Sequence, residues 1–182
     1  MRRSFRRIAA LRTDRRGIAA TEFALIAPFL IFLYVGSVQL ADAISASRKV
    51  TVTTRTLADL TSQYNSVTTS ITDTILKTAS QVMAPYDATV GTYTITHLST
   101  NSSGKPRVDW SRKYDGTTVS DGYRKNKKMD LPGSVSQPGS SVIMAEISYR
   151  YQPFVSPAML GSVTLKDTIY MLPRRSQSIP MN

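Results

Sequence analysis

A glycine and a glutamate, Gly17 and Glu22, stand five positions apart where a basic segment gives way to an apolar one. An ionised carboxylate near the end of an apolar helix is costly unless another group neutralises it. A cut between Gly17 and Ile18 would supply such a group, because the new α-amino end would begin the helix with Glu22 as its fifth residue. The amine and the carboxylate would then pair within one chain or between neighbours. These residues predict a processing site at Gly17 and Ile18 and an assembly role for Glu22.

The segments on either side of this pair predict how the chain meets a membrane. Seven arginines and one aspartate lie within the first 17 residues, and 19 residues without formal charge run from Phe23 to Ala41. That length is close to the roughly 20 apolar residues with which a helix crosses a bilayer. Basic residues stay on the cytoplasmic side, so the chain after the helix is expected on the opposite side. We expect a leader peptide at 1–17, a transmembrane helix at 18–44 and an exported domain at 45–182.

Three other interpretations explain the N-terminus less completely. Ala41-Asp42-Ala43 fits the small-x-small pattern of a signal peptidase site, but the apolar run exceeds the roughly 7–15 residues of a secretory signal. Arg2-Arg3-Ser4-Phe5 contains the paired arginines of a twin-arginine signal, yet further basic residues separate it from the apolar run. A permanent, uncut anchor accounts for the length and the charge, but it gives no reason for Glu22.

The stretch from Arg15 to Leu25 resembles the start of type IV prepilins: a basic leader, a glycine, four small or apolar residues, a glutamate and an aromatic residue. In detail it is similar to the TadE-like proteins of tight-adherence (Tad/Flp) pilus systems, in which Glu-Phe-Ala precedes an apolar run containing a proline, here Pro28. The C-terminal Tyr170-Met171-Leu172-Pro173-Arg174 also resembles, more weakly, the ending of that family. The resemblance covers about residues 12–64 and, weakly, residues 140–175.

This resemblance implies a minor pilin or pseudopilin in the biogenesis of a Tad/Flp-type pilus. A membrane prepilin peptidase would cut after Gly17, and Glu22 and Phe23 would set the register with neighbouring subunits. The implied partners are the membrane, that peptidase, other pilins or pseudopilins, and the Tad assembly-platform proteins. The implied location is the bacterial inner membrane, with the N-terminus cytoplasmic, the C-terminal domain periplasmic, and the pilus as a destination after processing. The alternative is an unprocessed single-pass membrane protein that presents an exported binding domain.

The spacing of apolar residues predicts two helices. Pro28 falls inside the first, where it removes a backbone hydrogen bond and is expected to kink the axis. Beyond the membrane this helix is expected to continue as a spine over 45–64, with an apolar stripe that lies against the exported domain. A coiled-coil contact with another chain is the rival interpretation of the stripe. The stripe consists of Ala43, Ala46, Val50, Thr53, Leu57, Leu60 and Tyr64. A second helix is expected over 70–84, with Ser70 as N-cap and Pro85 after its end.

After Pro85 the apolar period changes to two, which indicates strands. We expect four, at about 90–98, 107–114, 142–151 and 162–172, with a turn at 101–104. Residues 115–140 are rich in glycine and proline and predict a long loop, of a kind that is often functional or mobile. The expected fold class is α+β: a long N-terminal transmembrane helix continuing into a pilin-like exported domain with a short helix and an antiparallel sheet of about four strands.

The composition offers little for catalysis or for a cofactor. There is no cysteine, and the one histidine, His97, falls in a predicted strand, where we expect it to be packed or exposed and not catalytic. The spacing of four aspartates lacks the alternation of a calcium loop: Asp109, Asp115, Asp121 and Asp130. Much of the net charge of +11 lies in the leader, and the one dense cluster elsewhere is interpreted as a solvated loop: Arg124, Lys125, Lys127 and Lys128. We therefore expect no enzyme, no metal, no cofactor and no nucleic-acid partner.

Overall fold

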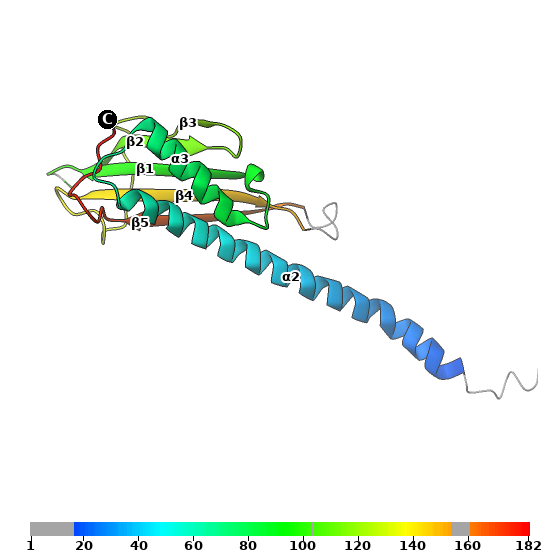
Figure 1. Cartoon of the computed structure of the whole chain (residues 1–182). Coiled ribbons are helices and arrows are strands. Elements are labelled where there is room, and N and C mark those ends of the chain that lie inside the picture. The colour runs from blue at the N-terminus through cyan, green and yellow to red at the C-terminus, as the bar shows by residue number, and fades with distance from the viewer. Residues whose placement is uncertain (1–16, 103, 154–160) are drawn as a thin grey trace, which may run out of the picture. The chain divides into compact units, whose positions relative to one another are not determined.

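The computed structural model describes residues 17–102, 104–153 and 161–182, and the chain divides into two compact units at the boundary between Ala41 and Asp42. The helices are α2 (Ile18–Ser62) and α3 (Thr69–Ser80), followed by two short 3₁₀ helices, Gln81–Met83 and Ala88–Val90. The strands are β1 (Gly91–Thr100), β2 (Pro106–Tyr114), β3 (Val119–Asp121), β4 (Ser141–Tyr151) and β5 (Val163–Met171) (Figure 1). The predicted α+β class, a long apolar helix followed by a short helix and an antiparallel sheet, is confirmed.

The sheet has five antiparallel strands in the order β3-β2-β1-β4-β5. The strand that the sequence did not predict is β3, which lies inside the segment interpreted as loop. It has only three residues and pairs Val119 with Tyr114 and Asp121 with Arg112. A strand this short carries too few residues to show an alternating pattern, so its neighbour in the sheet determines it and not its own sequence.

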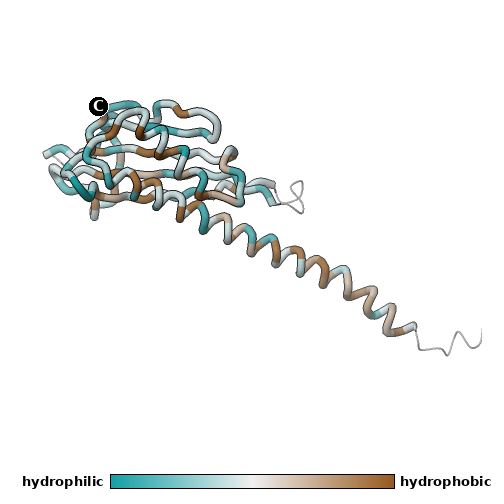
Figure 2. The backbone as a smooth tube through the Cα atoms, viewed as in Figure 1, coloured by the Kyte–Doolittle hydropathy of each residue, from teal (hydrophilic) through white to brown (hydrophobic). Residues whose placement is uncertain are grey.

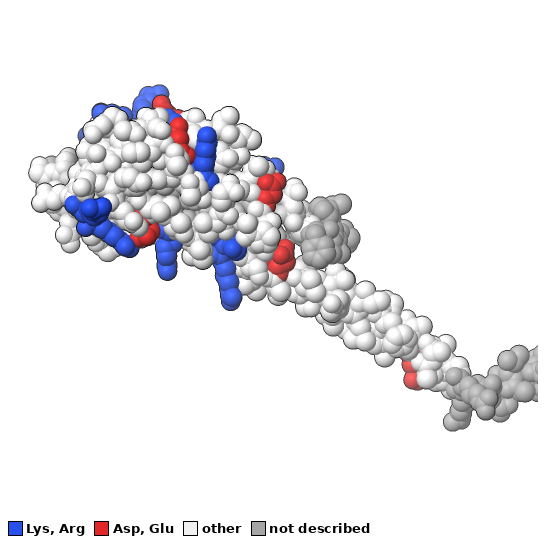
Figure 3. Space-filling view, viewed as in Figure 1, with Lys and Arg blue, Asp and Glu red and all other residues white. Residues whose placement is uncertain are grey.

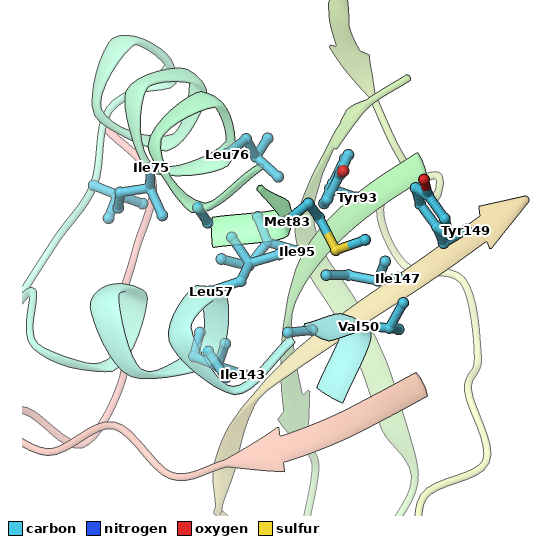
Figure 4. Packing of buried hydrophobic residues seen from close by; sticks show 14 of the residues in the cluster. Val50, Leu57, Ile75, Leu76, Met83, Tyr93, Ile95, Ile143, Ile147 and Tyr149 are labelled. Atoms are coloured by element: carbon cyan, nitrogen blue, oxygen red, sulfur yellow. The ribbon is translucent and has the colours of Figure 1, made fainter. Parts of the chain in front are cut away.

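The main core lies between the sheet and the helical segments of Asp42–Asn182. Alternating residues of β1 and β4, such as Ile95 and Ile147, face the apolar side of α3 and the second half of α2 (Figure 4). Val50 and Leu57 of the predicted stripe are buried there, and Thr53 is fully buried beside them. Each large side chain buried in this way contributes about 1.5–3 kcal/mol of transfer free energy. The far side of the sheet carries a smaller cluster of Leu98, Val108 and Met144, covered by Tyr123, Met129, Leu131 and Tyr170.

The start of α3 differs from the sequence interpretation, because Ser70 is not its N-cap. The helix begins at Thr69, and the Oγ of Thr68 accepts a hydrogen bond from the Ile71 backbone N–H at 3.3 Å. Thr68, Thr69 and Ser70 are all hydroxyl residues that can cap a helix. Tertiary structure chooses among them, since a bridge between Val67 and Met181 extends the backbone just before Thr68. The helix also ends earlier than expected, at Ser80.

Candidate functional site

The predicted processing and assembly residues lie at Gly17 and in the first two turns of α2. The helix begins at Ile18, so the side chains of Ile18 and Glu22 fall one turn apart on the same face. Phe23 is 68% exposed. In the described part of the chain, the Glu22 carboxylate makes no hydrogen bond or ion pair. The helix therefore presents Glu22 to groups outside these residues.

Packing does not explain why residue 17 is a glycine. A Cβ added at this position would meet no atom within 4 Å, and its backbone needs no left-handed conformation. A glycine that is required for folding usually shows one of these two constraints. The choice of glycine at position 17 therefore needs a reason other than the fold of the described chain.

The section of α2 from Ile18 to Ala41 is apolar around its whole circumference. Most of this section is coloured as hydrophobic in Figure 2. Its large side chains, such as Leu25 and Phe32, are mostly exposed, and Glu22 is its only charged residue (Figure 3). By length and composition, α2 is the one helix in the described chain that could cross a membrane. Pro28 lies inside the helix, which continues past it, and the kink expected there stays a prediction. This section is compatible with a single-pass membrane protein.

Asp42, the first charged residue after the apolar section, forms a hydrogen-bonded centre that the sequence did not reveal. Its carboxylate accepts hydrogen bonds from the Tyr86 hydroxyl at 2.9 Å and from the Tyr151 hydroxyl at 2.7 Å. Burial, followed by the hydrogen bond to Asp42, raises the pKa of Tyr86 to about 12 and also raises the pKa of Tyr151. These three side chains join α2, the segment after α3 and the end of β4. Only the place of Asp42 at the end of an uncharged run could have drawn attention to it.

His97 forms a second centre and is buried, at 1% exposure. Its Nδ1 lies 2.8 Å from Asp109 Oδ2, and its Nε2 accepts a hydrogen bond from the Ile179 backbone N–H at 3.2 Å. Its ring stacks on Trp110, whose Nε1–H donates to the Ile179 carbonyl oxygen at 2.7 Å. Although burial alone would raise the pKa of Asp109, the hydrogen bonds from His97 and Ser99 hold it below its usual value. The centre fixes the C-terminal tail to the sheet through Ile179, which is fully buried.

The same centre places a serine, a histidine and an aspartate in a row, with Ser178 Oγ 3.5 Å from His97 Nε2. A general base must have a free lone pair directed at the nucleophile's proton. The Nε2 lone pair of His97 is already occupied by the Ile179 N–H, and the contact with Ser178 is long. This geometry holds the tail in place and does not activate Ser178.

Arg112 links three elements of the domain by ion pairs. Its guanidinium lies 2.8 Å from Asp73 Oδ1 of α3 and 2.6 Å from Asp121 Oδ1 of β3. A planar guanidinium can hold two carboxylates at once because it has five N–H donors. Asp73 and Asp121 are thus used in structural pairing. The aspartates that the sequence weighed as calcium ligands do not meet as a cluster in the described chain.

The predicted site residues and the missed ones fall in different units. Gly17, Ile18, Glu22, Phe23 and Pro28 belong to the N-terminal unit, and none is brought next to a catalytic or metal-binding group in the described chain. The missed centres at Asp42 and His97 belong to Asp42–Asn182. Their partners are separated by up to 109 residues in the sequence.

Together these features define a class of protein: one apolar helix of membrane-spanning length, joined to an α+β domain with a five-stranded sheet. Residues 17–59 match the family model described as TadE-like protein, which confirms the predicted resemblance for this segment. The match covers α2 as far as Asp59 and does not include the sheet. The TadE-like family suggests a role in Tad pilus assembly. No curated protein and no solved structure matches the chain.

Proposed function

We propose that this protein is a minor pilin or pseudopilin that takes part in the assembly of a Tad/Flp-type pilus and has no enzymatic activity. The observation that carries the proposal is Glu22, which is exposed on an otherwise uncharged helical surface and has no partner among the described residues, five positions after a glycine that packing does not require. The TadE-like match over residues 17–59 supports the same role.

In this proposal a prepilin peptidase cuts after Gly17. The new α-amino group belongs to Ile18, and Glu22 lies four residues further along the same helical face. A carboxylate near a helix N-terminus is also favoured by the helix dipole. The amine of one subunit therefore pairs with the Glu22 carboxylate of its own or a neighbouring chain, and Phe23 packs beside that pair. Breaking a buried pair by removing one partner typically costs about 3–5 kcal/mol, which is enough to set register between subunits.

The proposed location is the bacterial inner membrane, with Asp42–Asn182 on the periplasmic side. The chain contains no cysteine, so a thiol reagent would label only a cysteine that is introduced by mutation. Its labelling shows on which side of the membrane that residue lies. We expect Thr117→Cys, at an exposed position, to react with a membrane-impermeant maleimide added to cells whose outer membrane has been made permeable. Labelling only after lysis would place the domain in the cytoplasm and contradict this orientation.

The assembly role is tested by Glu22→Gln, with Thr21→Val as the matched control. Thr21 also lies in the first turn of α2, and its hydroxyl bonds only to its own helix, at the Ile18 carbonyl oxygen. We expect Glu22→Gln to leave membrane insertion intact and to reduce the number of pili per cell about tenfold or more, because loss of about 1.4 kcal/mol per subunit contact is already a factor of 10. Thr21→Val should assemble normally. Normal piliation in Glu22→Gln cells would remove Glu22 from the mechanism.

A second candidate function, an unprocessed membrane protein that presents an exported binding domain, is favoured by one observation. The domain contains a cleft of about 810 Å³ lined by charged and aromatic side chains. This volume falls within the range of about 300–1,000 Å³ that ligand sites occupy. The two candidate functions predict different N-termini for the mature chain. The second requires that the arginine-rich leader stays on it.

A further inference from the structure

The cleft lies at the part of the domain where the C-terminal tail crosses β2. Its walls are β2, the segment from Asp121 to Lys125 and the tail residues Ser178, Pro180 and Met181. The site is thus formed by the basic, solvent-exposed segment together with the tail held by His97.

The basic turn at 124–128 is fixed to β2 by its backbone. The Asn126 N–H donates to the Val108 carbonyl oxygen at 2.7 Å, and the Val108 N–H donates to the Lys127 carbonyl oxygen at 3.0 Å. A bridge joins Arg107 to Lys128, and Asn126 adopts a left-handed conformation with φ of 63°. Asparagine is one of the few non-glycine residues that adopt this conformation readily in turns. The turn is therefore exposed to solvent, as the sequence predicted, and its backbone is hydrogen-bonded to β2.

Side chains on both flanks of the turn are anchored as well. Tyr123 before it and Met129 after it pack on the cluster of Leu98, Val108 and Met144. Gly122 lies so close to β2 that a Cβ would collide with the Ser111 Oγ. A turn held at both ends loses little conformational entropy when it binds a ligand, which favours affinity.

The cations that this turn presents to the cleft are Arg124 and Lys125, and the charge of Lys125 helps to lower the pKa of Asp109. Arg124 and Lys125 line the cleft and are exposed, and neither side chain makes a hydrogen bond or an ion pair there. By contrast, Arg112 is neutralised by Asp73 and Asp121, and Lys127 lies over the Tyr123 ring at 4.2 Å. Two exposed cations at neighbouring positions, Arg124 and Lys125, can hold a carboxylate through charge-assisted hydrogen bonds.

Carboxylates of the protein also line this cleft, and they restrict the class of ligand. Asp109 is 38% exposed and accepts hydrogen bonds from His97 and Ser99, which leaves acceptor capacity for a further donor. The Asp109 carboxylate would repel a phosphate placed beside it, and the binding of a chain of phosphates depends on positive charge throughout the contact. Sugar hydroxyls, in contrast, donate to carboxylates. A ligand with both hydroxyls and scattered carboxylates fits this mixture, and a nucleic acid does not.

We propose that this cleft binds an acidic oligosaccharide, in which Arg124 and Lys125 hold a sugar carboxylate while Asp109 and Ser178 bond to sugar hydroxyls. This site goes beyond the proposed role in pilus assembly and does not depend on cleavage after Gly17.

The test measures binding of tetragalacturonate to the full chain in uncharged detergent micelles. Trp110 is the only tryptophan and lines the cleft, so its fluorescence reports occupancy directly. The test variant is Arg124→Gln/Lys125→Gln. The matched control is Arg55→Gln/Lys166→Gln, which removes the same charge from exposed positions on α2 and β5. The carboxyl-reduced tetrasaccharide and a twelve-residue oligodeoxythymidylate serve as the neutral and the phosphate probes.

We expect the test variant to weaken tetragalacturonate binding about tenfold or more, as loss of two charge-assisted bonds implies, and the control to change it less than about twofold. The neutral tetrasaccharide should bind at least about tenfold more weakly than the acidic one. Equal weakening in both variants, equal affinity for the neutral sugar, tighter binding of the oligodeoxythymidylate, or no binding of tetragalacturonate would each overturn the proposal. Thermal unfolding of the two variants checks that both are folded.

Discussion

The two halves of α2 belong to one continuous helix, but their apolar side chains differ in exposure. From Ile18 to Ala41 the helix is apolar on all sides, and its large side chains are exposed in the chain by itself. From Asp42 to Ser62 most apolar residues form one stripe, and Ala46, Val50 and Leu57 of that stripe are buried in the core shared with the sheet. A helix that is apolar all round needs a membrane or a bundle, whereas one with a single stripe needs one packed surface.

The two halves also differ in whether their first carboxylate has a hydrogen-bond partner. Glu22 lies in the first half and has no partner in the described chain, while Asp42 opens the second half and accepts two tyrosine hydroxyls. In our proposal other molecules cover the first half, whereas the second half is packed against its own chain. The variants below test each side of that difference, beginning with the largest expected effect.

The largest effect is expected from a cavity in the second half of α2. Leu57→Ala removes a fully buried side chain and should lower the free energy of unfolding of the domain by about 2–5 kcal/mol. Leu33→Ala, which truncates a 51% exposed leucine in the first half, should change it by less than about 0.5 kcal/mol. Urea denaturation in micelles, followed by circular dichroism, measures both. Similar losses in the two variants would mean that the halves do not differ in this way.

The next effect concerns the two carboxylates. Asp42→Ala removes the carboxylate that accepts from the hydroxyls of Tyr86 and Tyr151, leaves Tyr86 only the backbone carbonyl oxygen of residue 42 at 3.1 Å, and should lower the free energy of unfolding by about 2–3 kcal/mol. Glu22→Ala should leave the same quantity unchanged, because that carboxylate bonds to nothing in the described chain. If Glu22→Ala destabilises the domain as much as Asp42→Ala does, then Glu22 also has a partner within its own chain.

A smaller and more local effect is expected at the tail. His97→Leu removes the acceptor for the Ile179 N–H and the partner of Asp109, so it should lower the local stability of residues 177–182 by about 1–3 kcal/mol. Hydrogen exchange at the Ile179 amide measures this opening. Ser178→Ala is the control, since its hydroxyl lies 3.5 Å from Nε2, and its exchange rates should match the parent protein. Unchanged exchange in His97→Leu would show that Ile179 is held by other contacts.

The smallest effect appears at alkaline pH. The folded state raises the pKa of Tyr86 from 10.0 to about 12, so it holds this proton more tightly than the unfolded chain does. The corresponding stability is fully present below pH 10 and is lost as the pH rises to about 12. Tyr86→Phe should be about 1 kcal/mol less stable at pH 8 and decline less steeply above pH 10. Parallel declines in the variant and its parent would show that Tyr86 does not cause the pH dependence.

Local sequence patterns predicted most helices and strands. They could not predict contacts between residues that lie far apart in the sequence. The spacing of Ala46, Val50 and Leu57 predicted the buried stripe because a helix repeats every 3.6 residues. No local pattern distinguishes Thr68 from Ser70 as N-cap, or reveals a three-residue strand such as β3. The contacts of Asp42 with Tyr151 and of His97 with Ile179 join residues 109 and 82 positions apart, which only the folded chain brings together. The roles of Gly17 and Glu22 remain predictions, because their proposed partners are other molecules.

We expect cleavage after Gly17 to supply the α-amino group that pairs with the carboxylate in the first half of α2. Intact mass and N-terminal sequencing of the protein extracted from membranes of its native cells test this most directly. We expect a chain that starts at Ile18 and lacks all seven leader arginines, and we expect Gly17→Leu to retain them. A mature wild-type chain that still starts at Met1 would contradict processing and would favour the uncut, membrane-tethered binding domain.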